Sequence, residues 1–211
     1  MIQITVFTFN PFGENTYVVY DETGEAIIVD PGNYDSREDT ILTSFIEEKG
    51  LKPVLIANTH AHVDHVLGVS YVKRKYGVPF ALHKGDEPVL RSVKVYAPNY
   101  GFAAYQEPEV DVWFAEGEEV RFGNSTLEIL FLPGHAPGHV GFYDKVGQRL
   151  IAGDVLFRES IGRTDLPGGN HATLLSSIRT KLFGLPDEVV VYPGHGPSTT
   201  IGHEKKFNPF F

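Results

Sequence analysis

The chain alternates short runs of apolar residues with turn-forming residues, and a few longer segments repeat their apolar positions at helical spacing. Short apolar runs bounded by Gly, Pro, Asn or Asp predict β-strands. Segments with apolar residues three and four positions apart predict helices that cover a sheet. The predicted strands are Ile2–Phe9, Thr16–Tyr20, Ala26–Val29, Val54–Ala57, Phe80–Leu82, Thr126–Leu132, Leu150–Ala152 and Val189–Tyr192.

Three helices are predicted between these strands. The first begins at Ser36, where Asp39 completes a capping box, and it ends at Gly50. The second runs from about Val66 to Tyr76, and the third opens near Asn170. Strands that alternate with helices predict a layered α/β architecture. The side chains expected to face the core are Ile41, Leu42, Phe45 and Ile46 in the first helix and Leu174, Leu175, Ile178 and Leu182 in the third.

Length and charge narrow the class of protein. A chain of 211 residues suits one domain, and 18 basic against 27 acidic residues give a net charge of −9, which argues against a nucleic-acid partner. No apolar run approaches the roughly 18 residues that span a bilayer, and the first residues do not resemble a signal peptide. The absence of cysteine excludes disulfides, thiolate ligands and a cysteine nucleophile. We therefore expect a cytoplasmic protein with no membrane or nucleic-acid partner.

Four metal-binding residue types follow the strand at Val54–Ala57, in the sequence THAHVDH. His60 and His62 are two positions apart, so in an extended segment they point the same way. Asp64 and His65 fall in the turn that enters the next helix and can face a second point nearby. Imidazole nitrogens and carboxylate oxygens suit Zn²⁺, Fe or Mn²⁺.

Three further donors share this placement after a strand. His135, Asp154 and His195 each follow an apolar run and stand beside a glycine. The carboxyl ends of strands are where open α/β sheets collect ligand groups. Seven nitrogen and oxygen donors are too many for one tetrahedral ion. The pattern therefore predicts two metal ions that share one bridging carboxylate.

The order of these motifs, from IIVDPG through the four metal motifs to TTIGHEKKFNPF, resembles the metallo-β-lactamase superfamily, and within it the glyoxalase II-like (hydroxyacylglutathione hydrolase) branch. The resemblance covers nearly the whole chain and implies a four-layer αβ/βα sandwich with the site at one edge. It implies that the first metal is held by His60, His62 and His135, the second by Asp64, His65 and His195, with Asp154 as the bridge.

The resemblance also implies an activity. Two divalent ions, with Zn²⁺ expected first and Fe or Mn²⁺ as alternatives, can activate a bridging hydroxide for attack on a carbonyl. Asp64 and Asp154 are the expected catalytic carboxylates. The expected substrate is a small thioester such as S-lactoylglutathione. A mononuclear-iron persulfide dioxygenase and a lactone or ester hydrolase are the alternatives.

The chain departs from the long glyoxalase II enzymes at its C-terminal side. Only 16 residues follow His195, so we expect one domain over residues 1–211 without the helical C-terminal domain of those enzymes. Their tyrosine two residues after the last metal histidine is Pro197 here. Glyoxalase II enzymes have a basic residue nine positions after the bridging aspartate that contacts glutathione, so the resemblance implies this role for Arg163, with a structural ion pair to Asp165 as the equal alternative.

Other polar and aromatic residues are open to more than one interpretation. Asp30 in IIVDPG either supports a metal-bound histidine or caps a turn. His139 is expected to make a supporting hydrogen bond rather than to bind metal, and surface or capping roles are expected for His83, His171 and His203. The aromatic stretch Tyr96–Tyr105 is a lid, an oligomer contact or plain packing on the sheet.

Overall fold

Strand β3 (Glu25–Val29) shows how the apolar runs are buried in the computed structural model, which describes residues 1–211. Ala26 and Ile28 point into one apolar core, and Ile27 and Val29 point into another. Successive side chains of a strand face opposite sides of the sheet, so a continuous apolar run predicts a strand covered on both faces. β3 is such a strand.

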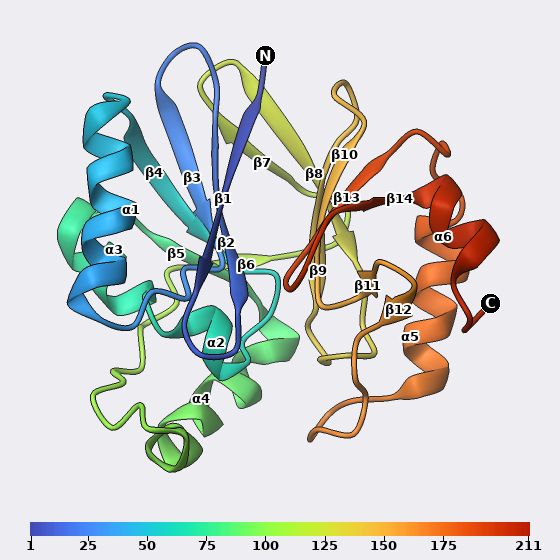
Figure 1. Cartoon of the computed structure of the whole chain (residues 1–211). Coiled ribbons are helices and arrows are strands. Elements are labelled where there is room, and N and C mark those ends of the chain that lie inside the picture. The colour runs from blue at the N-terminus through green and yellow to red at the C-terminus, as the bar shows by residue number, and fades with distance from the viewer.

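Twelve of the strands form two sheets of six that pack face to face (Figure 1). The first sheet pairs β1 to β3 antiparallel and β3 to β6 parallel. Its strands are, in order, β1 (Gln3–Phe9), β2 (Glu14–Tyr20), β3, β4 (Lys52–Ala57), β5 (Phe80–His83) and β6 (Val112–Phe114). The second sheet has the order β14 (Thr199–Thr200), β13 (Val190–Pro193), β10 (Arg149–Gly153), β9 (Val140–Asp144), β8 (Ser125–Phe131) and β7 (Glu119–Phe122). A small hairpin of β11 (Leu156–Phe157) and β12 (Ser160–Ile161) lies outside both.

Helices cover the outer face of each sheet, which makes four layers (Figure 1). One apolar core lies between the first sheet and its helices, one between the two sheets, and one between the second sheet and its helices. The helices of the first half are α1 (Ser36–Glu48), α2 (Val63–Val66), α3 (Val69–Tyr76) and α4 (Glu87–Tyr96), with 3₁₀ turns η1 (Lys84–Asp86) and η2 (Ala97–Tyr100). Those of the second half are α5 (His171–Ser177), its π-helical continuation η3 (Ile178–Leu182) and α6 (Ile201–Phe207).

The structure corrects the predicted first helix in two respects. Its N-cap is Asp35, whose side chain accepts hydrogen bonds from the backbone N–H groups of Arg37 and Glu38, so the capping box from Ser36 to Asp39 was wrong. Ile41 is 42% exposed rather than buried, because it lies on the solvent side of the helix.

The other two helices also differ in detail. The predicted helix from Val66 to Tyr76 is divided between α2 and α3, with Gly68 packed against the side chain of Asn33 between them. A β-carbon on Gly68 would lie 2.0 Å from Asn33 Oδ1, so the chain turns there on a glycine. In α5, Leu175 is only half-buried, whereas Leu174 is fully buried as predicted.

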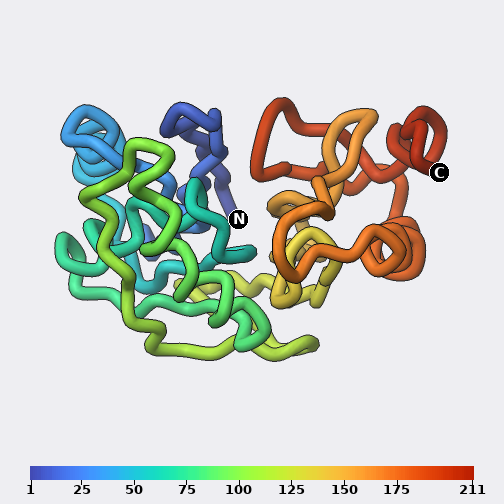
Figure 2. The backbone as a smooth tube through the Cα atoms, turned by 90° about the horizontal axis from the view of Figure 1, so that it is seen from below, coloured from blue at the N-terminus to red at the C-terminus, as the bar shows by residue number.

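The loops that carry the predicted metal ligands lie together at one edge of the two sheets. They follow β4 in the first sheet and β8, β10 and β13 in the second. Figure 2, seen from below, shows the first half of the chain (blue to green) beside the second half (yellow to red), so that loops of both halves meet. The structure contains no helix that is long and apolar enough to cross a membrane.

Candidate metal centre

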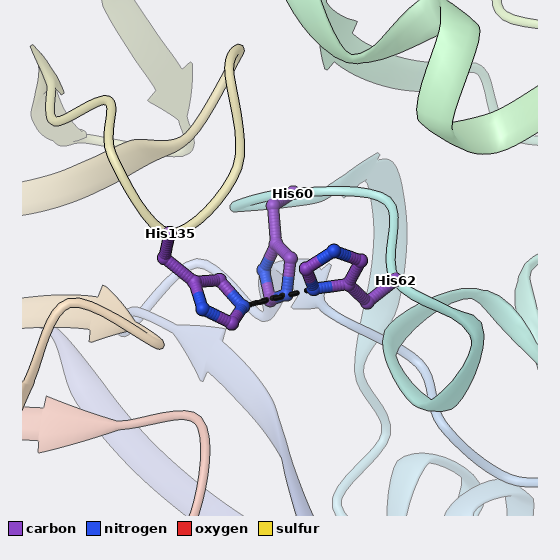
Figure 3. Close-up of side chains that lie close together, drawn as sticks. All are labelled: His60, His62 and His135. Atoms are coloured by element: carbon purple, nitrogen blue, oxygen red, sulfur yellow. Dashed lines mark hydrogen bonds between the residues drawn. The ribbon is translucent and has the colours of Figure 1, made fainter. Parts of the chain in front are cut away.

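Three imidazole rings converge where the two halves meet (Figure 3). Nε2 of His135 lies 2.9 Å from Nδ1 of His62 and 3.2 Å from Nε2 of His60. His60 and His62 are buried and come from the loop after β4, whereas the buried His135 comes from the loop after β8. We call these three residues the first group.

The spacing of these nitrogens fits a metal ion. Nitrogen ligands at 2.0–2.1 Å from a tetrahedral ion are about 3.3 Å apart. The distances within the first group lie close to that value, and one ring N–H can satisfy only one of the three facing nitrogens. The donor set therefore fits a divalent cation at this position.

Asp64, His65 and His195 form a second group beside the first. Nε2 of His195 lies 3.1 Å from Oδ2 of Asp64, and Nε2 of His65 lies 3.7 Å from the same oxygen. The donor atoms of this group lie within 4.8 Å of one another. His65 is fully buried, whereas the side chain of His195 is 27% exposed and faces the solvent side of the centre.

Asp154 lies between the two groups. Its Oδ2 is 3.6 Å from Nε2 of His135 in the first group and 3.5 Å from Nε2 of His195 in the second. Its Oδ1 is 3.6 Å from Nε2 of His65. Both Oδ1 of Asp154 and Nε2 of His65 are buried without a hydrogen-bond partner. Buried polar atoms are normally paired, so these two atoms are placed to bind a cation. All seven residues singled out by the sequence motifs are thus brought together.

Hydrogen bonds behind the rings orient their metal-facing nitrogens. The Nδ1–H of His135 can donate to the backbone carbonyl of Arg163 at 2.8 Å, and Nδ1 of His65 lies 3.1 Å from Oδ2 of Asp30. When Nδ1 carries the proton, Nε2 is the free donor atom. These two contacts thereby turn Nε2 of each ring toward the metal position.

The two groups differ in electrostatics. Burial lowers the pKa of His60, and it lowers the pKa of His62 to about 3, so these rings are neutral. Burial also lowers the pKa of His65, but the Asp64 and Asp154 carboxylates raise it by more, and the net shift is upward. In the second group a cation would therefore take the place of a proton, because a metal-binding imidazole must be neutral.

Asp30 and His139, which the sequence left with two readings, both support this centre. Asp30 accepts hydrogen bonds from the backbone N–H of Thr59 at 2.7 Å and from its hydroxyl at 2.6 Å, besides facing His65. Nε2 of His139 accepts a hydrogen bond from the backbone N–H of Asp154 at 3.1 Å. The supporting hydrogen bond predicted for His139 is confirmed.

Two buried polar residues near the centre were not singled out from the sequence. Asn58 donates through Nδ2 to the backbone carbonyl of His65 at 2.7 Å. Glu14 is fully buried with Oε1 3.9 Å from Nδ1 of His65, and burial raises its pKa well above the ordinary value. Asn58 is the first polar residue after the apolar run of β4, which was an available signal, whereas nothing in the local sequence distinguishes Glu14.

A cleft of about 850 Å³ opens onto both groups. One side is formed by the β1–β2 turn and α4 with η2, including Phe12, Tyr96 and Tyr100, and the other includes Phe157 and Arg163. The Arg163 guanidinium donates two hydrogen bonds of 2.7 Å to Asp165. The walls are mainly apolar, and Arg163 is the only Lys or Arg that lines them.

The aromatic stretch Tyr96–Tyr105 is divided between two environments. Tyr96 and Tyr100 line the cleft, and the ring of Tyr100 packs edge-on against Phe12 from the β1–β2 turn. Phe102 is buried in the core of the first half, and Tyr105 packs against that core. Part of the stretch is therefore a wall of the cleft, and part is plain packing.

This fold and this set of donors define a class of protein. The chain belongs to the metallo-beta-lactamase superfamily, which it matches over residues 9–195. It is 38% identical to hydroxyacylglutathione hydrolase GloC of Haemophilus influenzae, with 99% of this chain and 98% of that protein aligned. The resemblance drawn from the motifs and the four-layer fold are confirmed, and the chain is a metallo-hydrolase of this superfamily.

Two solved structures are close to this one. TTHA1623 in a di-iron-bound form has a TM-score of 0.87 and 38% identity, with 98% of this chain and 100% of that chain covered. The B3 metallo-beta-lactamase BLEG-1 has a TM-score of 0.87 and 35% identity, with 99% of both chains covered. The fold and the His/Asp groups together imply divalent metal ions.

Proposed function

We propose that the protein is a binuclear metal-dependent hydrolase of thioesters, with S-lactoylglutathione or a related glutathione thioester as substrate. The similarity to GloC over nearly the whole chain supports the thioester assignment. The metals would be held by the first group and the second group, with Zn²⁺, Fe and Mn²⁺ all compatible with nitrogen and oxygen donors. The di-iron-bound neighbour makes iron a serious candidate.

The position of Asp154 carries the proposal of two ions. One of its oxygens lies between His135 and His195, and the other faces His65. A carboxylate with neighbours in both groups suits a bridge between two cations, and a single tetrahedral ion cannot use all seven donors. We therefore assign Asp154 as the bridging ligand.

The mechanism divides the work between the metals and the chain. When bound, two divalent ions would activate a water molecule and polarise the substrate carbonyl. Asp64 and Asp154 supply the negative charge that holds the second group together. The Arg163 carbonyl and the Asp30 carboxylate lie at hydrogen-bond distance from Nδ1 of His135 and of His65, so that Nε2 of each ring faces the metal position. No serine or cysteine nucleophile is required.

The cleft is suited to position a thioester against this centre. Its apolar walls exclude water from the substrate. The Arg163 guanidinium, which also lines the cleft, can donate its hydrogen bonds to a substrate carboxylate in place of Asp165. The Arg163–Asp165 pair is exposed, with side-chain exposures of 61% and 66%, and exposed pairs are weak. A glutathione carboxylate can therefore compete for Arg163.

We also propose that residues 1–211 act as one hydrolase domain. The C-terminal helix α6 supports the cleft side of the second half, because the buried Glu204 accepts a hydrogen bond from the backbone N–H of Glu159 at 2.9 Å. Asn208 donates to the backbone carbonyl of Ser160, which lines the cleft. The last residues thus brace the β11–β12 hairpin.

A turnover panel on protein of measured metal content tests the function. It compares S-lactoylglutathione, an uncharged thioester with the same acyl group, a lactone, a β-lactam and glutathione persulfide. We expect the highest kcat/KM for the glutathione thioester, with two metals per chain. Activity confined to the β-lactam or the lactone would move the protein to another branch of the superfamily.

The persulfide dioxygenase alternative has a distinct signature. It requires one iron per chain and consumption of oxygen with glutathione persulfide. The presence of Asp64, His65 and His195 as a complete second group favours the hydrolase. One iron per chain with oxygen uptake, and no hydrolysis of thioesters, would reverse that choice.

A further inference from the structure

One carboxylate outside the seven metal-facing residues ties two of their loops together. Asp86 is fully buried at the end of the η1 turn. Its Oδ2 accepts a hydrogen bond from the backbone N–H of Ala61 at 2.7 Å, and its Oδ1 accepts one from the backbone N–H of Gly138 at 2.6 Å. Both oxygens are therefore used, and both partners are backbone groups.

The two partners lie inside the loops that carry the first group. Ala61 stands between His60 and His62, and Gly138 is three residues after His135. The first of these loops belongs to the first half of the molecule and the second to the second half. Asp86 therefore links, through two backbone hydrogen bonds, the segments whose rings must approach within about 3 Å.

Close packing shows that this link has little freedom. A β-carbon on Gly138 would lie 2.3 Å from the backbone nitrogen of Asp86, so only glycine allows the loop to approach the η1 turn. A β-carbon on Gly85 would lie 3.0 Å from Cα of Gly138. The Asp86 carboxylate can reach the backbone of Gly138 because neither Gly85 nor Gly138 has a side chain where the η1 turn meets the His135 loop.

Asp86 is also the residue before α4, which forms one wall of the cleft. Val89, Ser92 and Tyr96 of this helix line the cleft. The same residue thus sets the position of the helix relative to the loops of the first group. A change at Asp86 would move the wall and the metal-facing rings together.

The need for two acceptors explains why an acidic residue occupies this buried position. Burial raises the pKa of Asp86 to about 6, although the hydrogen bonds from Gly138 and Ala61 lower it. An asparagine has the same shape, but only one of its two terminal atoms accepts a hydrogen bond. Its amide group would face one of the two backbone N–H groups.

We propose that Asp86 is a positioning residue that fixes the distance between the His60–His62 loop and the His135 loop and so sets the metal affinity of the first group. The inference rests on the proposed metal centre, but its structural part holds for the metal-free protein. Asp86 itself contacts neither metal nor substrate in this assignment.

The test compares Asp86→Asn with the matched variant Asp21→Asn. Asp21 is also buried and also joins two turns, because it accepts hydrogen bonds from the backbone N–H groups of Thr23 at 2.9 Å and Asn124 at 2.7 Å. These turns connect β2 to β3 and β7 to β8, and neither carries a metal-facing residue. Both variants lose a carboxylate that accepts two backbone hydrogen bonds, but only one of them adjoins the metal centre.

We expect Asp86→Asn to weaken Zn²⁺ binding by about 10–100-fold in a chelator competition, as changes behind metal ligands typically do. With saturating metal, kcat/KM should still be lower than in the wild type, because the α4 wall of the cleft moves together with the metal-facing rings. Asp21→Asn should lower the unfolding midpoint to a similar extent and leave Zn²⁺ affinity and kcat/KM unchanged. Wild-type affinity in Asp86→Asn, or equal losses of affinity in the two variants, would overturn the proposal.

Amide exchange in metal-free wild-type protein gives a readout that does not depend on the variants folding. The N–H groups of Ala61 and Gly138 should exchange slowly in the wild type, because both donate to Asp86. In Asp86→Asn, the N–H group that faces the amide nitrogen should exchange faster. Fast exchange of both groups in the wild type would show that the link does not exist. If the wild type binds no metal at all, the proposed metal centre fails, and the exchange measurement still decides whether Asp86 joins the loops.

Discussion

The Asp30 carboxylate lies directly behind the imidazole of His65, with Oδ2 3.1 Å from Nδ1. Asp30 stands at the end of β3 with a left-handed φ of +48°, and it also accepts hydrogen bonds from Thr59. A non-glycine residue in this conformation is uncommon and is often found at functional sites. Asp30 thereby joins the end of β3 to the loop after β4 and orients His65.

Replacement of Asp30 by alanine should lower both the stability of the protein and its affinity for metal. The backbone N–H of Thr59 and Nδ1 of His65 would both lose their acceptor in a buried site, and each loss costs roughly 1–3 kcal/mol of unfolding free energy. Metal affinity should fall by about 10–100-fold. Denaturant unfolding of the metal-free protein and chelator competition measure the two effects. Asp35→Ala, which removes the N-cap of α1, should cost about 1 kcal/mol and leave metal affinity unchanged.

Asp154→Ala tests the shared carboxylate. Without it the two cations would lose the carboxylate that both are proposed to share and would repel each other more strongly, so we expect the loss of at least one metal per chain. Turnover should fall by about 100-fold or more, with the fold retained. Metal analysis and circular dichroism of the purified variant check both points. Two metals with unchanged turnover would show that Asp154 is not the bridge.

Arg163→Ala tests the proposed contact between Arg163 and a glutathione carboxylate. One charge-assisted hydrogen bond contributes about 1.5–3 kcal/mol, so kcat/KM for S-lactoylglutathione should fall by about 10–150-fold, with the exposed position of Arg163 favouring the lower end. The uncharged thioester should be affected little. Asp165→Asn, which releases Arg163, should leave activity on S-lactoylglutathione equal or higher. Equal losses on both substrates in Arg163→Ala would mean that Arg163 shapes the cleft instead.

The pH dependence of stability has a clear contribution from Asp21. Burial raises the pKa of this carboxyl, but hydrogen bonds from Thr23, Ser125 and Asn124 outweigh it and lower the pKa from 3.8 to about 2. A pKa that is lower in the folded state contributes stability above the unfolded pKa and loses it as the pH falls through the folded pKa. The contribution is about 2 kcal/mol for a shift of this size.

Asp21→Asn should therefore be less stable than the wild type by about 2 kcal/mol at pH 6, and the difference should shrink between pH 4 and pH 2. Urea unfolding of both proteins with a chelator present measures the difference, because all other carboxyls are shared. A difference that is constant over this range would contradict the depressed pKa of Asp21.

Local sequence patterns predicted eight of the fourteen strands, missing β6, β7, β9, β11, β12 and β14. They also singled out seven residues whose side chains converge at the edge of the two sheets. Both successes depend on neighbours in the chain. The run around Ile27 is apolar because both faces of β3 are buried, and His60 follows β4 directly. Residues that hold the site in place from a distant part of the chain leave no such pattern in the local sequence. Asp86 contacts Ala61 and Gly138, which are 25 and 52 residues away, and no spacing rule connects them.

Elements without a strong pattern of their own were also not predicted. Helix α4 is an exception, because Asp86 at its N-cap, Pro88 in its first turn and the buried residues Val89, Leu90 and Val93 do form a helix pattern in the sequence. The two-residue strands β11 and β12 are too short to show alternation. Their positions come from packing around the cleft.

The first group takes two of its rings from one half of the molecule and the third from the other, so a bound cation would fasten the halves together. Local unfolding of either half would separate these rings and release the cation. By mass action, each tenfold rise in free metal above the dissociation constant would add about 1.4 kcal/mol to the apparent stability. In a cell, the supply of metal would then govern how long each copy of the chain survives, because a metal-starved copy opens more often to proteases.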